Sequence, residues 1–157
     1  MLTATSVNAT MERFPIPSLP KCMGKTDYAT IKEVHQLLTA NVSLVESELG
    51  EGQNGYLGLI FPPEQYAHIS GTAFIIPPKP GRVAHILEWI TPGGDKIILR
   101  EHMEKIKMYD KCRTVDTTLK NQLILSFDDP YLSTLKNEYT GYATKTTMEM
   151  IHHFYEN

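Results

Sequence analysis

A glycine-rich stretch from Gly50 to Gly58 is the first part of the sequence whose spacing could support chemistry. Gly50, Gly52 and Gly55 match the G-x-G-x-x-G pattern of dinucleotide-binding loops. That loop binds phosphate when a strand leads into it and a helix leaves it, because the phosphate then lies at the helix N-terminus. Here a helical pattern precedes the glycines and a pair of prolines follows them, so we expect a turn. An enzyme that binds a phosphate ligand at this loop is the alternative that a strand before Gly50 would favour.

The densest cluster of titratable side chains lies near the end of the chain, where His152 and His153 are flanked by Glu149 and Glu156. Neighbouring residues on a helix point about 100° apart, so these two imidazoles cannot bind one metal ion. The sequence also lacks the H-E-x-x-H pattern of zinc peptidases. We therefore predict no metal site.

Three further residues of reactive type have structural explanations. Cys112 falls among regularly spaced apolar residues, which predicts a buried thiol. His102 lies between two glutamates of a charged helical segment, and we expect it on the solvent-exposed face. Asp116-Thr117 is followed by threonine, so the glycine of the aspartic protease loop is missing, and the chain has no G-x-S-x-G. The sequence therefore predicts no catalytic residue and no cofactor, and we do not expect an enzyme.

The element around which the rest of the chain is organised is a helical pattern from Asp95 to Phe127. Neither glycine nor proline interrupts it, and its apolar residues recur at steps of three or four. These residues are Leu99, Met103, Ile106, Tyr109, Cys112, Val115, Leu119, Leu123 and Phe127. We expect one apolar stripe along the whole helix, covered by the flanking segments.

A second helical pattern begins after Thr26 or Asp27, either of which can cap it, and continues for about 22 residues to Leu49. Gly50 is placed to end it. Shorter helices are expected from Pro63 to Ile69, from Pro130 to Tyr139 and from Thr146 onwards.

The last of these helices should begin with a capping box, because Thr146 and Glu149 have the required spacing. Its inward face is predicted to carry Met148, Ile151, His152 and Tyr155. The helix is short, so we expect it to continue beyond Asn157 and the domain to be truncated there.

The fold class that follows is mainly α, with two long amphipathic helices and several short ones. Residues 1–24 contain three prolines in FPIPSLP and no periodicity, which predicts a disordered or extended arm. Residues 25–157 would form the helical domain, with a proline-rich extended connector over about 70–94. Within that connector, residues 83–90 could be either a helix or a strand.

The composition predicts an intracellular protein. The chain has 157 residues, a net charge of −3 and two cysteines, which we interpret as reduced thiols of a cytoplasmic protein. We find no apolar run long enough to span a membrane and expect no membrane partner.

The long helix is the one net-positive element, with seven basic against four acidic residues over 96–127. Its candidate contacts for RNA or an acidic partner are Lys105, Lys107, Lys111 and Arg113. The simpler interpretation is a solvated face beside the apolar stripe.

The order of these segments resembles the Gag-like proteins of copia-type LTR retrotransposons. The resemblance spans roughly residues 14–157 and depends on FPIPSLPK, GYLGL, KNQLI and YLSTLKNEYTGYAT in that order. In the capsid-like region of that family, an aspartate-bearing helix is followed by a short helix, a glycine turn and a helix ending in an aromatic residue. These features fall at Asp116, Tyr131 to Tyr139, Gly141 and Thr146 to Tyr155.

By this resemblance the chain would be an N-terminal Gag-like piece of a transposable element. It would be a structural protein that self-associates into particles around element RNA. The glycine turn is less dense than in the family, and the zinc knuckle that binds RNA in many relatives is absent from this sequence. A helical protein-interaction adaptor without element ancestry is the competing interpretation.

Overall fold

The computed structural model describes residues 4–22, 27–81, 95–128 and 132–156, and it is mainly α-helical, as predicted. Its helices are α1 (Ala4–Arg13), α2 (Tyr28–Ser43), α3 (Pro63–Ser70), α5 (Asp95–Ser126) and α7 (Thr147–Glu156), with 3-10 turns η1 (Leu49–Gly52) and η2 (Leu57–Leu59). The described residues contain two isolated β-bridges, Cys22–Phe127 and Asn137–Gly141, and no named strand.

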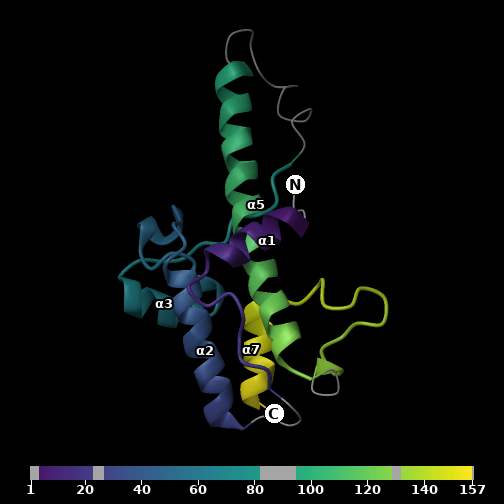
Figure 1. Cartoon of the computed structure of the whole chain (residues 1–157). Helices are drawn as coiled ribbons and strands as arrows, with labels where there is room; N and C mark the ends of the chain where they lie inside the picture. Colours follow the sequence, from purple (N-terminus) through teal and green to yellow (C-terminus); the bar gives the residue numbers. More distant parts are fainter. Residues whose placement is uncertain (1–3, 23–26, 82–94, 129–131, 157) are drawn as a thin grey trace.

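The long helix α5 is the axis of the molecule, and its predicted extent is confirmed within one residue. Figure 1 shows its C-terminal half beside α7 and α2, whereas its N-terminal half extends beyond α1 and away from α2, α3 and α7. Only the C-terminal half is therefore enclosed by these helices.

The prediction of one stripe along the whole of α5 is wrong. Met103, Ile106, Tyr109, Cys112 and Val115 follow at four consecutive steps of three residues. Each step falls about 60° short of a full turn, so the apolar residues move about 240° around the helix over this stretch. The C-terminal part of the pattern is buried, but Met103 and Ile106 are exposed and face a different direction.

Helix α2 begins at the predicted cap, because the Asp27 side chain accepts a hydrogen bond from the Thr30 amide at 2.9 Å. It ends at Ser43, however, and not at Leu49. The Val42 carbonyl accepts the Tyr56 amide at 3.0 Å, so the returning chain occupies a position that a further helical turn would need.

The description of residues 1–24 as a disordered or extended arm is wrong for its first part, because α1 is helical and packs on α5. Phe14, immediately after α1, is buried. The prolines that follow do hold the chain without regular structure, but this part is fixed in place, and the Ser126 hydroxyl donates to the Pro20 carbonyl at 2.5 Å.

The backbone of Ile16 is held by two buried side chains from different helices. Its amide donates to Asn41 Oδ1 at 2.9 Å, and its carbonyl accepts from Asn41 Nδ2 at 2.8 Å. Gln122 Nε2 donates to the carbonyls of Ile16 and Pro17, each at 3.0 Å. Asn41 and Gln122 lie 81 residues apart in the sequence, so no local pattern could predict this clamp.

Helix α7 has the predicted capping box, with the Glu149 amide donating to Thr146 Oγ1 at 3.1 Å and the Thr146 amide donating to Glu149 Oε1 at 3.4 Å. Its inward face is rotated by about one residue, or about 100°, from the prediction. Met150, Ile151 and Phe154 are buried, and the predicted His152 is exposed.

An aromatic contact accompanies the inward orientation of Phe154 on α7. Phe154 packs on Phe127 of the chain after α5, with ring centroids 4.4 Å apart. Met148 and Tyr155 of the predicted face are only half-buried. Both sides of this helix carry apolar residues, so the pattern alone could not choose between them.

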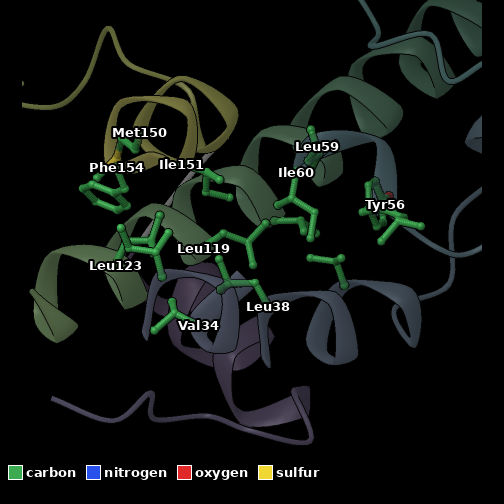
Figure 2. Close-up of a cluster of buried hydrophobic side chains, with 14 of the residues drawn as sticks. Val34, Leu38, Tyr56, Leu59, Ile60, Leu119, Leu123, Met150, Ile151 and Phe154 are labelled. Atoms are coloured by element: carbon green, nitrogen blue, oxygen red, sulfur yellow. The ribbon is translucent and has the colours of Figure 1, made fainter. Parts of the chain in front are cut away.

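The core lies between α2, α5, α7 and the loop of residues 50–60. Figure 2 shows side chains from these four segments pointing toward one another. The labelled residues, all buried, are Val34, Leu38, Tyr56, Leu59, Ile60, Leu119, Leu123, Met150, Ile151 and Phe154.

The predictions for the shorter elements have mixed outcomes. The helix expected from Pro63 is confirmed as α3, and Gly71 ends it in the left-handed conformation at φ 74°. Residues 72–81 of the connector form neither helix nor strand, and the undecided range 83–90 lies outside the described residues. Of the helix expected at Pro130 to Tyr139, residues 129–131 are also outside them, and residues 132–135 include one helical position followed by hydrogen-bonded turns.

Candidate partner-binding surface

The glycine loop is shaped by packing. Helix α2 leads into it, where the alternative of a phosphate site required a strand. Gly50 lies under the Tyr66 ring, whose hydroxyl donates to the Gln53 carbonyl at 2.6 Å, and a Cβ at Gly50 would collide with that hydroxyl.

The surroundings of Gly55 are equally unsuited to an anion. A side chain there would meet the carbonyl oxygens of Val42, Ser43 and Val45. These atoms are hydrogen-bond acceptors, and they would repel a phosphate. The glycines therefore permit close backbone approach and left-handed φ angles, 58° at Gly50 and 57° at Gly55.

The four predicted basic residues do not form one patch. Lys107 and Lys111 line a hollow of about 460 Å³ together with Glu48 and Glu104, so carboxylates lie beside both cations. Lys105 lies two residues from Lys107, which places it about 160° away around the helix.

Arg113 belongs to another hollow, of about 380 Å³, which Asp116 also lines. Its Nη1 donates to the Tyr109 hydroxyl at 3.5 Å. The cations that the sequence groups by proximity are thus distributed over several sides of α5, and each hollow that receives one also contains an acid.

A different surface emerges on the projecting half of α5. Leu99, Met103 and Ile106 are 39%, 54% and 36% exposed, and we call them the α5 ridge. Lys96, Arg100, Glu104 and Lys107 line a shallow hollow with Leu99 and Met103, so three cations and one carboxylate border the ridge. The ridge residues were identified in the sequence, but they were predicted to be covered.

A groove of about 410 Å³ lies between α3, α7 and the turn after η2, and we call it the α3–α7 groove. Its apolar lining comes from Ile60, Phe61, Pro62, Met148, Ile151 and Tyr155. Sequence analysis missed this groove, because its residues come from separate segments and are not spaced as a motif.

His35 of α2 lines the groove and joins three segments. Its Nε2 lies 3.0 Å from the Ile60 carbonyl and its Nδ1 lies 3.0 Å from the Tyr155 hydroxyl. A carbonyl only accepts, so Nε2 carries the proton and Nδ1 accepts from the tyrosine. Burial lowers the pKa of His35 from its ordinary value, although the hydrogen bond to Ile60 acts in the opposite direction.

We expect His35 to make the protein less stable as the pH falls below the ordinary histidine value of 6.5. In that range the unfolded chain binds a proton at this residue before the folded chain does, so protonation favours unfolding. Urea unfolding measured from pH 7.5 to 5.5 should show that the free energy of unfolding falls less for His35→Gln than for the natural chain. The slopes of this free energy against pH should differ by at most about 1.4 kcal/mol per pH unit. Parallel curves for the two proteins would contradict the assignment.

Asp116 of α5 holds the start of α7. Its Oδ1 accepts from the Thr147 amide at 3.2 Å, and its carbonyl accepts from the Thr147 hydroxyl at 2.9 Å. Burial raises the pKa of the Asp116 carboxyl, against the hydrogen bonds from Thr147 and the charge of Lys120. A raised carboxyl pKa in the folded state stabilises the protein as the pH falls, which is opposite in sign to the contribution of His35. Asp116 is present in both the natural chain and the His35→Gln variant, so its contribution does not change the difference between them.

The remaining candidates have structural roles. Cys112 is buried as predicted, and burial together with the nearby Asp116 raises the pKa of its thiol to about 12, so it is protonated at neutral pH. His102 was expected on a solvated face, but it is buried. Its glutamate neighbours in the sequence point to other sides of the helix, so they do not determine its exposure.

His152 and His153 contact different residues, as their adjacent positions on α7 require. His152 Nε2 lies 2.9 Å from Glu156 Oε1, and His153 Nε2 lies 3.0 Å from Thr134 Oγ1. Within the described part of the chain, no three His, Cys, Asp or Glu side chains are grouped to hold a metal ion.

Comparisons with known protein families, characterised proteins and solved structures find no significant match for this chain. No helix among residues 4–22, 27–81, 95–128 and 132–156 has the length and apolar character to cross a membrane.

Proposed function

We propose that this chain is a structural protein that associates with further copies of itself, as its resemblance to Gag-like retrotransposon proteins implies. The observation that carries the proposal is the α5 ridge, which places three apolar side chains in solvent on a helix that projects from the body. Adjacent apolar residues exposed on a projecting element are typical of a protein–protein contact.

Packing of the other apolar residues supports the same conclusion. The C-terminal half of α5 buries Val115, Leu119 and Leu123 against the neighbouring helices, so the chain can cover its apolar residues where partners exist. Solvent exposure of Leu99 and Met103 on the same helix costs hydrophobic free energy that a second molecule could recover.

RNA packaging is the second role that the resemblance implies, and the geometry supports it less. Phosphate binding needs several cations that face one strand. Lys107 and Lys111 share their hollow with Glu48 and Glu104, and Arg113 lines a separate hollow.

The self-association proposal is tested by light scattering coupled to size-exclusion chromatography. The natural chain is expected to exceed its monomer mass of 17.8 kDa increasingly with concentration. Met103→Glu should weaken association by about tenfold or more, because a charge in the contact must be desolvated. Circular dichroism should show unchanged helix content, since Met103 is exposed.

Leu125→Glu is the matched control. Leu125 is also an apolar residue of α5 and is 70% exposed, but it lies in the other half of the helix. This variant should associate like the natural chain. A natural chain that stays monomeric at every concentration would refute self-association, and equal weakening by both variants would refute the role of the ridge.

A further inference from the structure

The α3–α7 groove is an apolar hollow at the surface of the molecule. Its lining is predominantly apolar and it is open at the surface. The ridge offers a row of exposed apolar side chains on the projecting half of α5. Helices that present apolar residues at such spacing commonly bind in apolar grooves.

The charges around the two surfaces are opposite. Helices α3 and α7 contain three glutamates, Glu64, Glu149 and Glu156, and neither helix contains a lysine or an arginine. All three glutamates are exposed. The ridge is bordered by Lys96, Arg100 and Lys107 against the single Glu104.

Local partners leave Glu149, which lines the groove, and Glu156, at the end of α7, accessible. Lys145 lies 3.9 Å from Glu149, whose side chain is still 52% exposed, and His152 lies 2.9 Å from Glu156. Exposed pairs of this kind contribute little free energy, so they can be exchanged for contacts with a partner.

Contact between two ridges is the simpler arrangement, but the charges oppose it. Two copies of the same surface would bring Lys96, Arg100 and Lys107 of one molecule near the same cations of the other. Like charges across an interface disfavour association. The groove offers the carboxylate of Glu149 in their place.

We propose that the α5 ridge of one copy docks in the α3–α7 groove of a second copy. This inference rests on the proposed self-association and specifies which two surfaces meet. Each molecule carries one ridge and one groove at different places, so the contact is heterologous and can continue from copy to copy.

The test uses two variants that each damage one surface. Met103→Glu places a negative charge on the ridge, and Met148→Lys places a positive charge in the groove, where it faces the cations of an incoming ridge. Each variant alone should associate at least about tenfold more weakly than the natural chain. An equimolar mixture should regain association, because the ridge of the Met148→Lys protein is intact and so is the groove of the Met103→Glu protein.

Gln65→Lys provides a second groove variant in case Met148→Lys does not fold, because Gln65 lines the groove and is exposed. If the natural chain associates but the folded groove variants associate equally well, and mixing with Met103→Glu restores nothing, the ridge-to-groove contact is wrong while self-association stands. If the natural chain is monomeric, both proposals fail.

Discussion

Leu119→Ala is expected to lower the free energy of unfolding by about 2–5 kcal/mol, the range for removing a buried leucine side chain. Leu119 is completely buried on α5. Figure 2 shows it between Leu38 of α2 and the α7 side chains, so surrounding atoms from three helices would have to move to fill the space. Urea unfolding followed by circular dichroism measures the loss, and Leu123→Ala should behave similarly.

Leu125→Ala is the control for this prediction. It removes the same atoms from the same helix at a position that is 70% exposed, and we expect a change within about 0.5 kcal/mol. A loss below that value for Leu119→Ala as well would show that the C-terminal half of α5 does not face the core.

Asn41→Ala is expected to cost about 1–3 kcal/mol, because it leaves the part-buried amide of Ile16 without its acceptor. Gln122 still donates to the Ile16 carbonyl in this variant, so the carbonyl stays paired. The segment after α1 should loosen, and hydrogen exchange of the Ile16 amide should accelerate more than exchange in the centre of α5. Both quantities can be measured on the same protein.

Gln36→Ala tests whether the effect belongs to the clamp. Gln36 is an exposed amide residue of α2, the helix that carries Asn41, and its loss should leave stability and exchange at Ile16 nearly unchanged. A double-mutant cycle of Asn41→Ala with Gln122→Ala should give a coupling of about 0.5–3 kcal/mol, because both side chains bind the Ile16 carbonyl. Additive losses, or unchanged exchange at Ile16, would contradict the clamp.

The two proposed surfaces suggest how association and folding could be separated by experiment. Met103 is exposed and Leu119 is buried, although both lie on α5 and both belong to the same apolar pattern. Substitution of Met103 should weaken association and leave the free energy of unfolding almost unchanged. Substitution of Leu119 should lower the free energy of unfolding and leave the ridge intact.

Much of the secondary structure could be read from the sequence. Asp27 and the Thr146–Glu149 capping box mark the starts of α2 and α7, and the absence of glycine and proline gives the length of α5. These signals depend on hydrogen bonds and backbone sterics within one turn, so they need no knowledge of distant residues.

The sequence by itself therefore determined a mainly helical chain, the starts of its principal helices and the burial of Cys112 and Leu119. Only the tertiary structure decided which side of α7 faces inward, where α2 ends and which half of α5 is covered. It also joined Asn41 and Gln122 to the chain around Ile16 and brought α3 and α7 together as a groove. The physical reason is that burial and hydrogen bonding here depend on segments far apart in the chain, and a helical period does not specify which neighbour will cover a given face.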